Sequence, residues 1–354
     1  MYWALWQERR CRAARPTSCG CMSWMGAKMR PRPLVCRMLV LAAIVSAAPS
    51  LDCAQTATIP ENTRREVAVT FDDVPGVQTD GDNCKPNALE RLNRRLLSRI
   101  QRNDVPVIGF VVESRLCGEQ RQALPGLLSM WLNRGFQLGN HTYSHLDLNK
   151  TEVSAYERDI LSGEAVTNQL LGAKGKRMEY FRYPYLHAGN DAVAKAEIQK
   201  FLAARNYRLA PVTIDNQEWM FAEVYARAVH EHDAALSLRI RGAYLVYMAE
   251  VFGFFERLSR EVVGYEVKQI LLLHDNPLNA DCFDDLAKMM KRRGYSFITL
   301  EQALQDKAYA VPDSYVGPEG ISWLHRWAFT KGLKIKQEPR EPEWIDRLYK
   351  QAMQ

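Results

Sequence analysis

The sequence predicts a single α/β domain of the (β/α)7-barrel type. Short apolar segments rich in β-branched residues alternate with longer segments whose apolar residues recur at spacings of three and four. This alternation is typical of parallel strands covered by helices. Seven such strand segments favour a closed or nearly closed barrel over an open sheet, and no Gly/Ser-rich linker divides the 354-residue chain.

The predicted strands and helices follow one another in a regular order. The strand segments are 66–71, 105–112, 136–140, 178–183, 207–214, 269–274 and 295–300. Amphipathic segments between them predict helices at 87–103, 153–172 and 191–206. Residues 221–265 depart from this rhythm, since they form a long helical and aromatic stretch that we expect to be a pair of helices packed on the barrel.

Residues 1–54 are expected to be a targeting segment ahead of the barrel, which we assign to residues 55–310. The basic stretch 29–37 precedes the apolar run 38–45 and small residues that allow cleavage after Ala47. We interpret this pattern as an export signal with an over-long start, Met29 or Met38 being the better initiator. The protein is therefore expected in the periplasm or outside the cell. The apolar run is too short for a stable membrane span.

Charge and cysteine content limit the classes of binding partner and the possible disulfides. Residues 1–54 carry eight Lys or Arg and two acidic residues, which accounts for the formal net charge of +6. The remainder is balanced, so nothing indicates a nucleic-acid partner. Beyond the signal the cysteines are Cys84, Cys117 and Cys282. Cys84 and Cys117 could pair in an oxidising compartment, but three thiols allow three pairings. Residues 311–354 are expected to be an extension packed on the barrel.

Polar side chains follow five of the predicted strands. They are Asp72 with Asp73, His141 with His145, Arg182, Asp215 and His274. The carboxyl ends of parallel strands meet at one rim, and charged groups beside buried strands are costly unless they are paired or liganded. A spacing of four would also place both histidines on one side of a helical turn. These features predict a functional site at that rim.

The residue types at this rim suit metal-assisted hydrolysis of an acyl group. Asp73, His141 and His145 supply one carboxylate and two neutral imidazoles, a set that favours zinc or a similar divalent cation with positions left open for water and substrate. Asp72 can serve as general base, and His274, on a distant strand of the same rim, as general acid.

Four motifs carry a resemblance to a known family. They are "TFDD" at 70–73, "HTYSH" at 141–145, "RYPY" at 182–185 and "LLLHD" at 271–275. In this order and at these intervals they resemble the polysaccharide deacetylase family, carbohydrate esterase family four, over about residues 67–304. The resemblance implies a distorted (β/α) barrel that hydrolyses N- or O-acetyl groups on glycans with bound Zn²⁺, or sometimes Co²⁺ or Ni²⁺.

The resemblance also implies a role for each motif position. Asp72 would be the base that deprotonates water at the metal, and the metal ligands would be Asp73, His141 and His145. Arg182 would hold the base carboxylate, and the backbone N–H of Tyr185 would help stabilise the oxyanion. Leu272 would wall the acetyl pocket, and His274 would protonate the departing amine or alkoxide.

One motif departs from the family pattern. Where relatives usually show an Asp-Trp pair, this chain has "DNQEW" at 215–219, so that Glu218 stands in the aspartate position and Trp219 is retained. Either Glu218 or Asp215 could orient His274. Trp219 could stack on a sugar ring or fill the core.

The sequence as a whole predicts a metal-dependent hydrolase that removes acetyl groups from an N-acetylated glycan of the peptidoglycan or chitin type. Two alternatives stay open. An O-acetyl esterase of xylan-like substrates would use the same residues, and a catalytically inactive relative would only bind carbohydrate. The oligomeric state does not follow from the sequence.

Overall fold

The computed structural model describes residues 65–77 and 87–353. The expected export signal with its start and cleavage positions, and Cys84, lie outside these residues. Within them Cys117 is disulfide-bonded, whereas Cys282 is a buried free thiol. None of the described helices combines the length and apolar character needed to cross a membrane.

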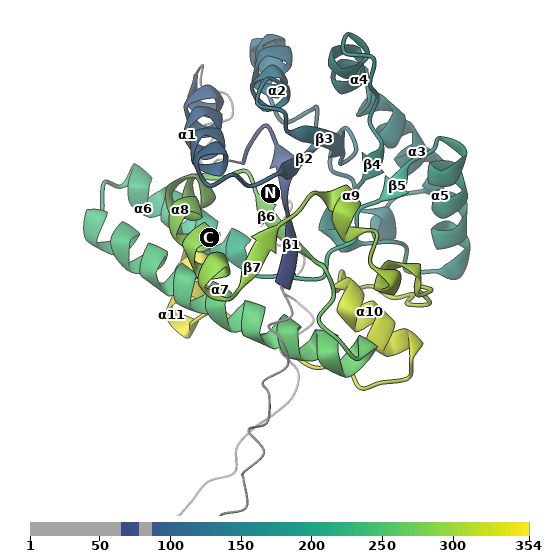
Figure 1. Cartoon of the computed structure of the whole chain (residues 1–354). Coiled ribbons are helices and arrows are strands. Elements are labelled where there is room, and N and C mark those ends of the chain that lie inside the picture. Colours follow the sequence, from purple (N-terminus) through teal and green to yellow (C-terminus); the bar gives the residue numbers. More distant parts are fainter. Residues whose placement is uncertain (1–64, 78–86, 354) are drawn as a thin grey trace, which may run out of the picture. The chain divides into compact units, whose positions relative to one another are not determined.

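Seven parallel strands form the curled sheet of the described chain (Figure 1). They are β1 (Arg65–Val74), β2 (Val107–Val111), β3 (Gln137–Asn140), β4 (Tyr180–Phe181), β5 (Arg208–Leu209), β6 (Gln269–His274) and β7 (Tyr295–Phe297). The order is β5-β4-β3-β2-β1-β6, and β7 also pairs with β1. β1 and β2 are almost wholly buried, as expected for parallel strands with both faces covered.

The segment that follows β5 brings the two ends of the sheet together. The N–H of Ala210 donates to the carbonyl of Phe181 at the end of β4 (2.8 Å), and the N–H of Ile214 donates to the carbonyl of Ile270 in β6 (3.0 Å). A few residues that continue the edge strand β5 thus bond to β4 beside it and to β6 at the other end of the strand order, which curls the sheet into a distorted barrel. The predicted α/β barrel architecture is confirmed.

Helices cover the outside of this sheet (Figure 1). They are α1 (Ala88–Arg102), α2 (Leu124–Leu132), α3 (Val153–Ser162), α4 (Ala165–Gly172), α5 (Ala192–Ala204), α6 (Glu218–His230), α7 (Ala234–Val263), α8 (Pro277–Arg292), α9 (Leu300–Ala303), α10 (Trp323–Thr330) and α11 (Glu343–Ala352). The sequence pattern explains their orientation: in α1 the buried Leu89, Leu92, Leu96 and Ile100 recur at spacings of three and four.

The segment predicted as one helix over 153–172 forms two helices, α3 and α4. The break lies at Gly163, where an added Cβ would lie 2.7 Å from the carbonyl carbon of Thr142. Only glycine allows so close an approach of two backbones. The break therefore lets the end of α3 press against the loop that carries the two predicted metal-binding histidines.

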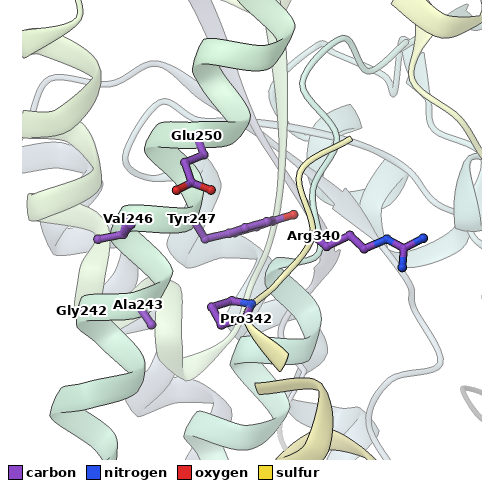
Figure 2. A pocket seen from close by; sticks show the side chains of 7 residues that line it. All are labelled: Gly242, Ala243, Val246, Tyr247, Glu250, Arg340 and Pro342. Carbon is purple, nitrogen blue, oxygen red and sulfur yellow. The ribbon is translucent and has the colours of Figure 1, made fainter. Parts of the chain in front are cut away.

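Residues 311–353 pack against the barrel. The N–H of Trp323 at the start of α10 donates to the carbonyl of Val212 (2.6 Å), and Tyr349 of α11 contacts Trp219 with ring centroids 5.2 Å apart. A hollow between α7 and the chain before α11 is lined by residues that include Tyr247 and Arg340 (Figure 2). None of the predicted site residues lines this hollow.

Candidate active site

Two consecutive carboxylates at the end of β1 face the same region. Asp72 pairs in register with His274 of the neighbouring strand β6. Successive side chains of a regular strand point to opposite faces. Here the register shifts between Phe71 and Val74, and Asp73 takes a left-handed backbone conformation (φ 65°). The Nε2 atom of His141 consequently lies 3.6 Å from Asp72 Oδ2 and 4.0 Å from Asp73 Oδ1.

His141 and His145 lie on a loop after β3, so the expectation that a helical turn brings them together is wrong. Thr142 and His145 both have left-handed backbone conformations (φ 65° and 58°). Asp159 of α3 holds this loop by accepting from the backbone N–H (3.0 Å) and hydroxyl (2.6 Å) of Ser144. The irregular loop still brings the two imidazole centroids to 4.9 Å from each other.

Asp73, His141 and His145 form a group that fits a divalent cation. One ligand atom from each lies within 4.8 Å of the others. Both carboxylate oxygens of Asp73 are buried and accept no hydrogen bond of ordinary geometry from the described residues, although Arg115 forms an ion pair with Oδ1 at 2.5 Å. A buried carboxylate with unused lone pairs is costly unless a cation satisfies it.

The protonation states of these residues also suit metal binding. Burial lowers the pKa values of both histidines to about 4, so that both imidazoles are neutral near pH 7. Burial alone would raise the pKa of Asp73, but the positive charge of Arg115 and the neighbouring histidines lower it well below its usual range. His141 Nδ1 lies 2.8 Å from the carbonyl of Arg182, a contact in which Nδ1–H donates, and its Nε2 lone pair is left for a cation.

Arg182 fixes the carboxylate of Asp72. Its guanidinium is fully buried and donates from Nη1 to both oxygens of Asp72 (3.2 and 3.3 Å), from Nη2 to Thr70 Oγ1 (3.0 Å) and from Nε to the carbonyl of Ala210 (2.7 Å). The Cζ atom of Arg182 also lies 4.6 Å from the ring centroid of Phe110. Such a fully engaged arginine holds the carboxylate in one orientation.

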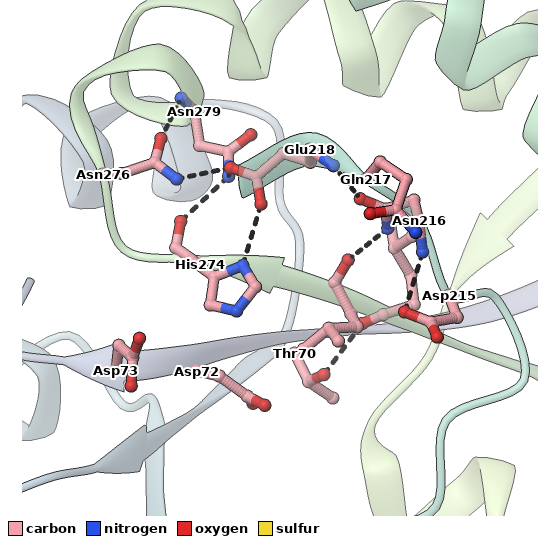
Figure 3. A network of polar contacts seen from close by, with 12 residues as sticks. Thr70, Asp72, Asp73, Asp215, Asn216, Gln217, Glu218, His274, Asn276 and Asn279 are labelled. Carbon is pink, nitrogen blue, oxygen red and sulfur yellow. Dashed lines mark hydrogen bonds and ion pairs between the residues drawn. The ribbon is translucent and has the colours of Figure 1, made fainter. Parts of the chain in front are cut away.

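His274 is paired with Glu218, not with Asp215. The ring lies between Glu218 and the carboxylates of β1 (Figure 3), and Nδ1 lies 2.8 Å from Glu218 Oε2. Burial opposes the charged ring, but the hydrogen bond and charge of Glu218, with the charges of Asp73 and Asp72, raise the pKa of His274 to about 9. His274 is therefore a proton donor at neutral pH.

Asp215 instead accepts the N–H of its neighbour Asn216 (2.8 Å). Burial, followed by the charge of Glu338, raises its pKa well above the usual range. The structure thus selects Glu218 over Asp215 as the partner of His274. The extra methylene of Glu218 relative to aspartate does not prevent the contact.

The other predicted residues lie around this centre. Leu272 is buried two residues before His274 on the same face of β6. Tyr185 lies in a short 3₁₀ turn, η5 (Pro184–Leu186), and its ring packs edge-on against His145 with centroids 4.5 Å apart. Trp219 contacts Tyr349 of α11, so part of its surface is used in packing.

Several residues of the site were not anticipated. Arg115, which pairs with Asp73, follows the end of β2 and could have been found by the same rim argument. Asn276 and Asn279 donate to Glu218 Oε1, the latter at 2.7 Å. The carboxylate of Asp275 is buried and has no hydrogen-bond partner among the described residues, and burial with the nearby charge of Asp73 raises its pKa to about 8.

Replacement of one ligand should abolish tight metal binding. We expect His145→Ala to weaken zinc affinity by at least about 100-fold, since losing even an outer partner of a ligand costs 10–100-fold. Zinc titration calorimetry on chelator-treated protein measures this. The control is His230→Ala, which removes an exposed histidine of α6. Equal zinc affinity of the His145 variant and the unmodified protein would exclude His145 as a ligand.

Comparison with known proteins agrees with this geometry. Residues 60–202 match the polysaccharide deacetylase family. A peptidoglycan-N-acetylglucosamine deacetylase of Bacillus cereus is 26% identical over 248 residues, 68% of this chain and 69% of the relative.

Two solved structures are similar at lower identity. A peptidoglycan deacetylase from Bacillus subtilis is 18% identical over 68% of this chain and 90% of that chain, with a TM-score of 0.43. A family four pseudoenzyme from Bacillus anthracis is 14% identical over 69% of this chain and 67% of that chain, with a TM-score of 0.45. Residues 60–202, which contain the motifs at 70–73, 141–145 and 182–185, belong to the polysaccharide deacetylase family.

Proposed function

We propose that the protein is a metal-dependent deacetylase that hydrolyses the acetamide of an N-acetylated glycan. The observation that carries this proposal is the pair of neighbouring residues Asp72 and His274, in register on adjacent strands, beside the group Asp73, His141 and His145. A carboxylate proton acceptor and a protonated imidazole next to one cation site are what general acid–base hydrolysis requires.

Asp73, His141 and His145 would hold the cation. When bound, a divalent cation there polarises the acyl oxygen and lowers the pKa of water, and zinc is the ion that this ligand set favours. The choice between zinc, cobalt and nickel rests on the ligand types alone.

The proton path runs between two anchored side chains. Asp72, oriented by Arg182, would accept the proton of the attacking water. His274, charged because Glu218 supports it, would donate its proton to the departing amine nitrogen. Both side chains are fixed by buried partners, so little reorganisation accompanies the transfer.

The backbone N–H of Tyr185 and the side chain of Leu272 complete the proposed site. The N–H would donate to the oxyanion of the tetrahedral intermediate, and Leu272 would contact the acetyl methyl group. The position of Tyr185 beside His145 supports this role, since an oxyanion donor must lie next to the reacting carbonyl.

Peptidoglycan or chitin-type oligosaccharides are the proposed substrates. The relative from Bacillus cereus acts, by its name, on N-acetylglucosamine of peptidoglycan. An O-acetyl esterase acting on xylan-like polymers would need the same base, acid and ligands, so the two activities are distinguished by assay.

Acetate release tests the proposed reaction. Zinc-loaded protein should release acetate from oligomers of β-1,4-linked N-acetylglucosamine, and Asp72→Asn should lower kcat by about 10²–10⁴-fold while zinc binding is retained. The control is Asp104→Asn at an exposed position. Release from acetylated xylan alone would favour the esterase, release from neither substrate would favour a carbohydrate-binding protein, and full activity of the Asp72 variant would exclude Asp72 as the base.

The pH profile tests the acid. Because the pKa of His274 is raised to about 9, its protonated form is present below that pH and activity should fall as the pH rises through a value no higher than about 9. Glu218→Gln removes the interactions that raise this pKa, so the alkaline limb of kcat should move to lower pH by one unit or more. Glu119→Gln, at an exposed site, is the control. An unshifted limb would show that another group limits the rate.

A further inference from the structure

The backbone of η5 adopts an unfavourable conformation at two consecutive residues. Tyr185 (φ 57°) and Leu186 (φ 55°) are both left-handed, although neither is glycine. Non-glycine residues rarely adopt this backbone conformation, and it persists only where the surrounding structure enforces it. The neighbours of η5 therefore determine where the Tyr185 peptide lies.

Residues 313–326 supply that enforcement through a buried arginine. Arg326 of α10 is 1% exposed, and its Nη2 donates to the carbonyl of Leu186 (2.8 Å). Its Nη1 donates to Asp313 Oδ2 (3.0 Å), and Asp313 also accepts from the buried Lys195 of α5 (2.8 Å). The carbonyl of Leu186 is thus hydrogen-bonded to the guanidinium of Arg326, which is itself anchored to α5 through Asp313.

The loop before α10 presses on the residue before Leu186, which is Tyr185. A Cβ at Gly320 would lie 1.8 Å from the carbonyl oxygen of Tyr185 and 3.1 Å from Cδ2 of His187. The obstacle is backbone and cannot rotate away, so glycine is required for this contact. The side chain of Asn149 also holds this loop by donating to the carbonyl of Pro318 (3.2 Å).

We propose that residues 313–326 are a positioning element of the active site. They hold the backbone of Tyr185 where its N–H can stabilise the oxyanion. This rests on the proposed deacetylase function. The element lies outside the segment 60–202 that matches the family, so that this chain completes its site with residues from its C-terminal part.

The sharpest test is Gly320→Ala, because the added methyl must displace the Tyr185 carbonyl. On oligomers of β-1,4-linked N-acetylglucosamine with saturating zinc, we expect kcat to fall about tenfold or more while KM changes less than about threefold, as for a loss of transition-state stabilisation. On metal-free protein, hydrogen exchange followed by mass spectrometry should show faster exchange over residues 183–189. Gly126→Ala on α2, where nothing lies within 4 Å of the new methyl, is the matched control.

Asp313→Asn provides a second, isosteric variant that weakens the anchor of Arg326. A several-fold lower kcat and faster exchange over residues 183–189 are expected, and this variant decides the matter should Gly320→Ala not fold. If folded variants keep kcat within twofold and their exchange is unaltered, the positioning role is overturned while the deacetylase function stands. If the unmodified protein releases no acetate, the proposed function is overturned and this inference falls with it.

Discussion

The buried guanidinium of Arg182 is the interaction on which the site depends. It joins the ends of three strands. Arg182 itself follows β4, and its guanidinium donates to Thr70 and Asp72 of β1 and to the carbonyl of Ala210, which follows β5. Its backbone carbonyl also fixes the ring orientation of His141. Without this cation Asp72 would be a buried carboxylate with no compensating charge at bonding distance, a state that costs several kcal/mol. One residue thus orients the proposed base Asp72 and, through a different atom, the proposed metal ligand His141.

Three histidines within the same rim are held in opposite protonation states by their neighbours. Burial disfavours the charged forms of His141 and His145, and the charge of Arg115 adds to this effect at His145. His274 is also largely enclosed, yet the carboxylate of Glu218 bonds directly to its ring and makes the charged form the stable one. The same type of side chain therefore suits the proposed ligand role in two places and the proposed acid role in the third, and local charge makes the difference.

The sequence was sufficient for the order of the strands and for most of the rim residues, although Arg115 was missed, since hydrophobic periodicity and the ends of parallel strands follow simple rules. The backbone geometry at those ends did not follow from it. Asp73, His145 and Tyr185 all depend on left-handed conformations of non-glycine residues, which are imposed by tertiary contacts and leave no local signal. For the same reason neither the choice of Glu218 over Asp215 nor the contact of Gly320 with Tyr185 could be predicted.

We propose that one cation is held jointly by Asp73, His141 and His145. Anomalous diffraction at the zinc absorption edge, from crystals of zinc-loaded protein, tests it most directly. The predicted result is a peak about 2.0–2.2 Å from a carboxylate oxygen of Asp73 and from Nε2 of both histidines. A peak at another site, or well-ordered side chains of these three residues with no peak between them, would contradict the account.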